Sequence, residues 1–342
     1  MAPNPTPFVA QRKSARNLVL SPFVQAAYGG ALADASLTRR QRFDGSAIFE
    51  QSQTRRTDKD MAGKGTVFAT DGQVIGWDSK FDFKAELDDW LAGWAFALAM
   101  GKEVVTAAAG GVAPFSHAVA FDETTTEAPA TTLYLEDTAA VKYKALDMAL
   151  NDLTLTIPGR GACGIELSLL GTGRWTAGAM AGGPPAIAAY NYILGSDSAF
   201  SIGAAGAAAE ITGRHMSTTL KISNACINHV APGGGLYGVF VRRGIPTFSI
   251  QTTIMAKETD DILTLFENDT LSDLKWVINS GASAQLNLEV AHAKLKTTKL
   301  GIDGNSVVWQ IECDDSSSYA QAGAPALAVT VVTATPAYLA AA

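Results

Sequence analysis

The chain has 342 residues, of which 47% are hydrophobic and only 17% charged, and its formal net charge is −7. This acidic balance argues against a protein that holds nucleic acid through phosphate contacts, because such proteins carry lysine and arginine in excess. It is compatible with a surface along which DNA passes without adhering, and the three widely spaced cysteines imply no disulfide framework.

Residues 1–45 are predicted to form an N-terminal arm. Three prolines fall within the first seven residues, and the stretch that follows has no sustained hydrophobic period. No apolar signal core is found near the start, so we expect the protein to be made and kept in a reducing cytoplasm until assembly. The arm is basic, and we expect it to reach an acidic neighbouring copy or to be solvated, with DNA binding as the alternative. Its basic residues include Arg12, Lys13, Arg16, Arg39, Arg40 and Arg42.

Residues 66–79 are predicted to form a β-hairpin. The dipeptide Asp71-Gly72 lies between two short apolar runs and suits a tight turn that needs positive φ. Residues 52–65, which precede the hairpin, are charged and contain several glycines, a composition typical of a loop or a sheet edge.

The one long, strongly periodic helix is predicted at about residues 85–100. Its apolar residues recur at i, i+3, i+4, i+7, i+8 and i+11, which places them on one face. Asp88 and Asp89 lie in the first turn, where the helix dipole favours negative charge, and Gly101 ends the helix. The uncharged run is shorter than the roughly 20 residues that a membrane span needs, so we expect a core helix and no membrane insertion. The core residues of this helix are Leu87, Trp90, Leu91, Trp94 and Leu98.

After the helix the sequence is typical of strands. Residues 145–157 alternate strongly between two sets of side chains, but the phase of the alternation slips at Asn151-Asp152. Such a slip indicates a bulge or a turn, because one extra residue moves every following side chain to the other face. A further half-buried strand is predicted at 165–169.

The chain divides near its middle at a stretch rich in glycine and alanine, which we interpret as a linker or a long surface insertion. The second half again carries strands, with short helical patterns at 258–266 and 271–278, so a tandem duplication is an alternative to a single unit. The predicted divisions are 1–45 for the arm, 46–175 for the first β-domain half, 176–215 for the linker, 216–335 for the second half and 336–342 for a loose C-terminal tail.

We find no constellation of residues typical of catalysis. The four histidines lack metal-ligand spacing, and Cys226 and His229 form the one close pair of ligand types, whereas a structural zinc needs four ligands. The glycine-rich stretches lack the strand and helix that surround a phosphate loop or a dinucleotide fingerprint. No nucleophile elbow occurs, and adjacent acidic residues do not face each other on a helix. We therefore expect no enzyme activity, no cofactor and no metal.

Residues 55–102 resemble the tail tube proteins of long-tailed bacteriophages. The resemblance rests on RRTDKDMAGKG, on the hairpin and on FDFKAELDDWLAGWAFALAMGK, with PFVQAAYGGAL upstream and ALDMALNDLTLTIPGRGACGIELSLLGTGRW downstream similar in pattern. It extends loosely over residues 15–315. It implies a mainly β fold, a tail-tube-type sandwich or barrel with one packed α-helix.

The resemblance also implies a function. It indicates a structural virion protein that polymerises as stacked rings into the hollow tail tube through which phage DNA passes without specific binding. Rings of six subunits are implied, or rings of three if the chain is duplicated. The tape measure, terminator and distal tail proteins are the implied partners. The implied location is the virion tail, after assembly in the cytoplasm of a bacterial host.

Acidic side chains within or beside the alternating strands are candidates for the channel lining, because like charge repels the DNA backbone. Plain solvent-facing alternation explains the same pattern. Two other functions are kept as alternatives: another virion component, such as a head–tail connector or a decoration protein, and a module that binds a carbohydrate or a cell surface through Trp175, Tyr190 and Tyr192. The candidate lumen-facing residues are Asp147, Asp152, Glu166, Glu289 and Glu312.

Overall fold

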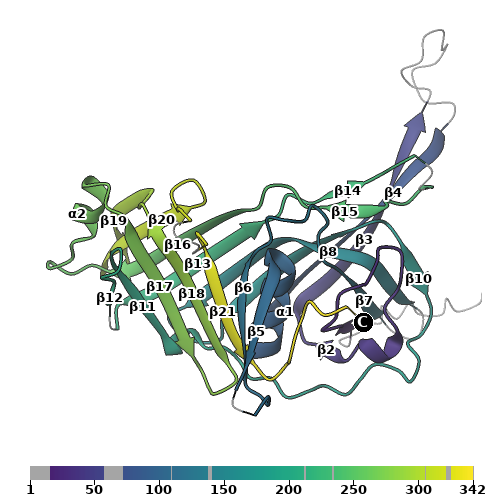
Figure 1. The fold of residues 1–342 in the computed structure, drawn as a ribbon, viewed down its shortest axis with the longest axis horizontal. Helices are drawn as coiled ribbons and strands as arrows, with labels where there is room; N and C mark the ends of the chain where they lie inside the picture. The colour runs from purple at the N-terminus through teal and green to yellow at the C-terminus, as the bar shows by residue number, and fades with distance from the viewer. Residues whose placement is uncertain are drawn as a thin grey trace, which may run out of the picture.

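Two antiparallel β-sheets make up most of the protein, and one helix lies between them (Figure 1). The fold is mainly β, as predicted, and the described residues include two α-helices, α1 (Asp89–Met100) and α2 (Ile262–Glu267). The computed structural model describes residues 16–57, 72–108, 110–137, 141–211, 213–232, 235–304, 306–320 and 325–341.

The large sheet has twelve strands. They are β1 (Arg16–Leu20), β2 (Arg39–Gln41), β3 (Asp44–Thr57), β4 (Gly72–Glu86), β7 (Ala130–Asp137), β8 (Val141–Pro158), β9 (Gly164–Gly171), β10 (Trp175–Ala177), β13 (His215–Ser223), β16 (Thr247–Met255), β19 (Thr297–Asp303) and β20 (Ser306–Asp314).

The small sheet has seven strands, and a third sheet is a two-stranded hairpin. The small sheet consists of β5 (Gly101–Ala107), β6 (Phe115–Phe121), β11 (Ser198–Ala204), β12 (Ala209–Glu210), β17 (Ser272–Asn279), β18 (Gln285–Ala293) and β21 (Ala328–Thr333). The hairpin pairs β14 (Ile227–His229) with β15 (Phe240–Arg242), and short 3₁₀ turns occur at Asp34–Ser36 and Gly195–Asp197.

The large sheet branches at β8. The first part of this 18-residue strand pairs with β7 and β10, and the second part lies between β13 and β9. From that second part an unbroken antiparallel path runs in the order β19-β20-β16-β13-β8-β9-β4-β3, called the long path below. Among the described residues, β19 pairs only with β20 and β3 only with β4, so each end of the long path has an open backbone edge.

The phase slip predicted in β8 is confirmed. The register between β8 and β9 shifts between Leu150 and Asp152, and the strand continues as a bulge rather than turning back. The side-chain amide oxygen of Asn151 accepts a hydrogen bond from the backbone N–H of Cys226 at 2.7 Å. The bulge therefore changes the face to which the following side chains of β8 point, and it also fixes the loop before β14.

The predicted hairpin is present only in part. β4 pairs antiparallel with β3, with Thr57 opposite Gly72, so its partner strand lies earlier in the chain than expected. Residues 52–57 belong to this edge strand. Residues 58–71, including Asp71 of the predicted turn, lie outside the described residues.

The core helix is confirmed, although α1 begins at Asp89 because Ala85 and Glu86 still belong to β4. All twelve residues of α1 are buried, so the helix is covered on every side and not along one stripe. The five predicted core residues are all buried, with Leu87 just before the helix. Small residues such as Ala92 and Ala99 on its remaining faces let the surrounding chain approach closely.

Buried side chains satisfy both ends of α1. The carboxylate of Asp88 accepts hydrogen bonds from two backbone N–H groups of the first turn. At the other end, the guanidinium of Arg243 donates to the carbonyl of Met100 at 3.1 Å, and the Asn224 amide donates to the carbonyl of Ala99 at 2.8 Å. A positive charge at this end complements the helix dipole and keeps the last carbonyls bonded inside the core.

Two predictions for the second half and the tail are wrong. The segment 271–278, predicted to be helical, is strand β17, in which Leu274, Trp276 and Ile278 alternate with more exposed residues and face the core. The tail expected to be loose is packed, because Tyr338 is 1% exposed and belongs to the main hydrophobic cluster.

Both halves of the chain share one sheet and one core. β8 of the first half pairs with β13 of the second, and one hydrophobic cluster runs from Leu18 to Tyr338. β1 and β2, which lie in the segment predicted to be an arm, join the large sheet, and β11 and β12 lie within 176–215. The division into two halves, and their duplication, remain predictions.

Candidate functional surface

The face of the large sheet that points away from α1 is polar along the long path. Alternation sends every second side chain to this face, and most residues there are half-buried or exposed. One row across four strands consists of Glu312, Gln251, Thr219 and Thr156. The next rows consist of Lys221, Thr154, Glu166 and Lys84, and of Ser223, Asp152, Ser168 and Asp82.

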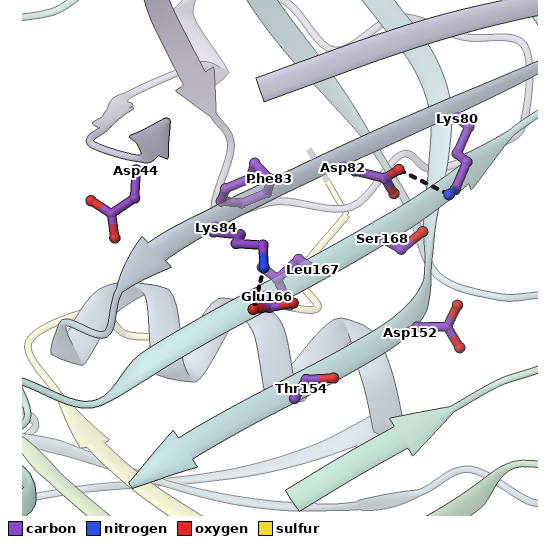
Figure 2. A pocket seen from close by; sticks show the side chains of 10 residues that line it. All are labelled: Asp44, Lys80, Asp82, Phe83, Lys84, Asp152, Thr154, Glu166, Leu167 and Ser168. Carbon is purple, nitrogen blue, oxygen red and sulfur yellow. Dashed lines mark hydrogen bonds and ion pairs between the residues drawn. The ribbon is translucent and has the colours of Figure 1, made fainter. Parts of the chain in front are cut away.

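A groove of about 600 Å³ lies on this polar face over β4, β9 and β8 (Figure 2). Two ion pairs cross it, Lys84 with Glu166 at 2.5 Å and Lys80 with Asp82 at 2.8 Å. All four side chains are about half exposed, so water and salt screen both pairs and neither contributes much stability. The groove is a mixed-charge surface with a surplus of carboxylates, to which Asp44 and Asp152 also belong.

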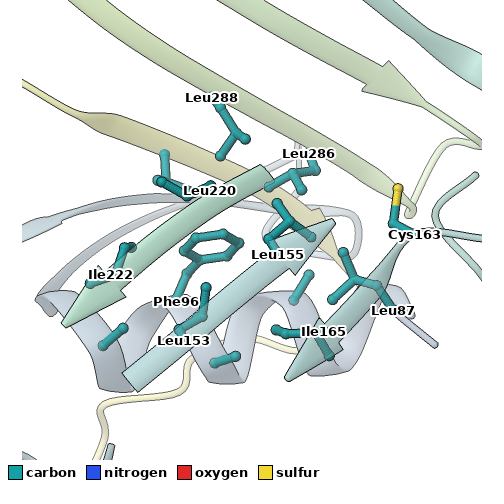
Figure 3. Close-up of a cluster of buried hydrophobic side chains, with 14 of the residues drawn as sticks. Leu87, Phe96, Leu153, Leu155, Cys163, Ile165, Leu220, Ile222, Leu286 and Leu288 are labelled. Carbon is teal, nitrogen blue, oxygen red and sulfur yellow. The ribbon is translucent and has the colours of Figure 1, made fainter. Parts of the chain in front are cut away.

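The opposite face of the same strands is apolar and packs on α1. Leu153 and Leu155 of β8 and Ile165 of β9 point toward the helix, and each is at most 1% exposed (Figure 3). The sheet therefore has one face buried in the core and one face in water, which explains the clean alternation of these strands in the sequence.

Three of the five predicted lumen-facing residues lie together on the polar face. Asp152 and Glu166 line the groove, and Glu312 lies further along the same face on β20. Glu289 lies on the outward face of the small sheet, on the other side of the molecule, with its carboxylate 3.9 Å from Lys275.

The family described as phage tail tube protein matches residues 23–310. The chain belongs to the phage tail tube protein family. The match covers most of the chain and confirms the resemblance predicted around residues 55–102. The family consists of structural proteins of the phage tail and is not a class of enzyme. The match therefore favours a tail tube over a connector, a decoration protein or a carbohydrate-binding module. No curated protein matches the chain.

The expectation that Asp147 faces a lumen is wrong for this tail tube protein. The residue is fully buried with a positive φ of 59°, and its carboxylate accepts hydrogen bonds from the backbone N–H of Gly29 at 2.7 Å, the Thr172 hydroxyl at 2.5 Å and Arg174 at 3.1 Å. It fixes the segment after β1 onto β8. The sequence could have indicated this burial, because the residues two positions before and after Asp147 are the small Ala145 and Ala149, which leave room for a covering segment.

The three aromatic residues predicted for a binding module do not form one platform in the tail tube protein. Tyr190 and Tyr192 stack at 5.8 Å, and the guanidinium of Arg39 lies 4.5 Å from the centroid of the Tyr190 ring. Trp175 lies on β10 against Tyr143. The same Arg39 pairs with Asp88 at 3.0 Å, so this residue of the predicted basic arm binds within its own chain.

One serine and one histidine come within hydrogen-bond reach. The Ser198 hydroxyl lies 3.0 Å from Nδ1 of His215, but Nε2 of that ring contacts the Thr218 hydroxyl and no carboxylate. Burial lowers the pKa of His215. This cluster, which also accepts the indole N–H of Trp276, is a polar contact between the two sheets and not a catalytic triad.

The described ranges contain neither a metal-binding cluster nor a membrane-spanning helix. No group of three or more histidine, cysteine, aspartate or glutamate side chains there is arranged to hold a metal ion. No helix in that part of the tail tube protein is long and apolar enough to cross a membrane.

Proposed function

We propose that this tail tube protein polymerises into closed rings that stack into a hollow tube, and that the polar face of the long path lines the channel for phage DNA. The observation that carries the proposal is the unbroken path of eight antiparallel strands, polar on one face and open at both edges. Such edges pair with a strand of another chain unless they are covered.

The direction of the edge strands fits closure into a ring. Seven antiparallel pairings separate β19 from β3, so these two strands run in opposite directions. A second copy in the same orientation therefore offers its β3 antiparallel to β19 of the first, which continues the sheet without breaking its alternation.

The number of strands is compatible with rings of three. An eight-stranded barrel is filled by its own side chains, whereas barrels of about 16–18 strands leave an aqueous channel. One copy is therefore too small to enclose a channel, and three copies with eight strands each would contribute 24. Rings of six subunits are the alternative and would give a much wider barrel.

The charge of the polar face supports passage without binding. The surplus of carboxylates repels phosphate, and the hydroxyl and amide side chains between them keep the surface hydrated. Between β4 and β20 the lysines on this face are Lys80, Lys84 and Lys221, and the carboxylates include Asp82, Glu86, Asp152, Glu166 and Glu312. Glu289 faces the other side and is left out of the proposed lining.

The remaining partners follow from the role. A tube of defined length needs the tape measure, terminator and distal tail proteins at its ends and within it, and we propose that the subunit assembles with them in the host cytoplasm before the tube becomes part of the virion tail.

Negative-stain electron microscopy of the purified protein at high concentration tests the proposal. We expect long hollow tubes of regular ring spacing, with three-fold symmetry in end-on views. Six-fold symmetry built from six copies would overturn the rings of three. Flat plates, or rings that do not stack even after addition of phage tail tips as an initiator, would overturn the tube itself.

A further inference from the structure

Two groups of large apolar side chains are exposed at opposite ends of the molecule. The first, called the end patch, lies on α2 and the β19–β20 hairpin, and the second, called the hairpin patch, lies around β14 and β15 (Figure 1). The end patch consists of Leu263, Phe266, Leu300, Ile302 and Val307, which are 38–80% exposed. The hairpin patch consists of Ile75, Ile227, Val230, Leu236 and Val239, which are 36–63% exposed.

The end patch is a core face that nothing within the described chain covers. In the β19–β20 hairpin, Ile302 is paired with Val307, and Leu300 is paired with Trp309. These four side chains lie on the same side of the sheet as the buried Ile311. Toward the turn of this hairpin the small sheet no longer covers that side, and Ile302 is 80% exposed. A side chain of this size at that exposure, next to four others, is typical of an interaction surface.

The hairpin patch is held rigidly on the body of the protein. The backbone N–H of Trp77 in β4 donates to the carbonyl of Leu236 at 2.8 Å, and the amide of Asn228 donates to Asp78 at 2.6 Å. β4 is the neighbour of the edge strand β3, and the hairpin patch contacts β4 on the side away from β3, so this patch lies near one open edge of the long path, whereas the end patch includes the other edge strand, β19, itself. A pre-ordered apolar surface loses little conformational entropy on binding.

The charges around the two patches are complementary. Residues 257–269, which contain α2, carry five carboxylates and one lysine, and Glu258, Asp261 and Glu267 among them are exposed. Residues 226–246 carry no carboxylate and include the exposed Arg242. An acidic rim at one end, and a segment with one exposed arginine and no carboxylate at the other, favour contact between unlike ends and disfavour contact between two end patches.

We propose that the end patch of one copy docks on the hairpin patch of the next, as an apolar contact beside the joined strand edges. The inference rests on the proposed function and adds to it the side chains that select the neighbour. Because the two surfaces differ, the contact is head-to-tail, and a rotation that brings each end to the next copy closes a ring.

Cross-linking of mixed single-cysteine variants tests the inference. Ile302→Cys and Val230→Cys are made separately in a Cys226→Ser background, and each is treated with a short bis-maleimide, alone and mixed, under assembly conditions. We expect covalent dimers in the mixture and none in either variant alone. Dimers of Ile302→Cys with itself would overturn the inference, and so would a mixture without cross-links.

A substitution with a matched control separates this inference from the proposed function. Ile302→Asp should raise the concentration needed for assembly about tenfold or more, because it buries a charge in the contact. Val104→Asp changes another exposed aliphatic residue outside both patches, 56% exposed where Ile302 is 80% exposed, and should leave assembly unchanged. If wild-type tubes form and Ile302→Asp assembles equally well, the docking contact is wrong and the tube stands. If mixture-specific cross-links form but wild-type protein makes no tubes, the contact stands and the tube is wrong.

Discussion

Nδ1 of His117 lies 2.7 Å from a carboxylate oxygen of Glu103, and both side chains are buried. Glu103 also accepts hydrogen bonds from the backbone N–H groups of Tyr338 and Leu339, at 3.1 and 3.0 Å, and Nε2 of His117 contacts the carbonyl of Thr335 at 2.9 Å. Although burial raises the pKa of Glu103, these hydrogen bonds hold it below its usual value. The pair fixes the C-terminal segment against the small sheet and over α1.

Glu103→Gln should destabilise the subunit by about 2 kcal/mol, because it removes a charged acceptor that several buried N–H groups use. Urea unfolding of the unassembled subunit measures the loss. Glu289→Gln is the control, since its carboxylate is half exposed and 3.9 Å from its lysine, and it should change the free energy of unfolding by less than about 0.5 kcal/mol. Equal losses in the two variants would contradict the role of Glu103.

The contribution of Glu103 should also depend on pH. Its pKa is lowered in the folded state, so the stabilisation is fully present above the ordinary value of 4.5 and is lost as the pH falls through the lower, folded-state value. The difference in unfolding free energy between wild type and Glu103→Gln should therefore be constant near neutral pH and shrink below 4.5. A difference that grows on acidification would contradict the geometry described above.

Gly93→Ala should destabilise the subunit by about 1–3 kcal/mol through overpacking, although alanine is the better helix former by about 1 kcal/mol. A Cβ at this position would lie 2.3 Å from the Tyr338 ring, which rests on the helix there. Combining Gly93→Ala with Tyr338→Ala should cost less than the sum of the single changes, as a double-mutant cycle in urea would measure. A more stable Gly93→Ala variant would show that the C-terminal segment does not press on α1.

Asp147→Asn should destabilise the subunit by about 2 kcal/mol, because the amide cannot satisfy the buried donors of Gly29, Thr172 and Arg174 equally well. Asparagine tolerates the left-handed backbone at this position, so the change tests the charge and not the strain. Glu166→Gln, on the polar face, should cost little because its side chain is 53% exposed. The same unfolding experiment compares them, and a larger loss for Glu166→Gln would reverse their assigned roles.

The helix and the alternation of the strands could be predicted from the sequence, because both depend on local periodicity. The stripe from Leu87 to Leu98 marks a buried helix, and the slip at Asn151 marks a bulge, without knowledge of what packs on either. The alternation alone could not separate Asp147 from Asp152, because both alternate with apolar residues. Only the small neighbours of Asp147 indicated room for the segment that folds over β8 and buries it. The segment 271–278 has apolar residues at spacings that suit either a helix or a strand. It forms a strand because it pairs with β11 and β18.

Lysine substitutions on the polar face should slow DNA ejection. Asp152→Lys, Glu166→Lys or Glu312→Lys places a cation where phosphate would pass, whereas Glu289→Lys, on the other face, should leave the rate unchanged. Ejection from phage that carry each variant, followed by release of a DNA-binding dye, gives the rates at low and high salt. A slower rate only for Glu289→Lys would assign the lining to the small sheet.

A cryo-electron microscopy reconstruction of the assembled tube tests the central claim most directly, because it shows which face of the subunit surrounds the channel. We predict that the strands from β19 to β3 form a continuous barrel with Asp152, Glu166 and Glu312 toward the lumen and Glu289 on the outside. A channel surrounded by the small sheet, with Glu289 facing the lumen and the long path on the outside, would contradict the account.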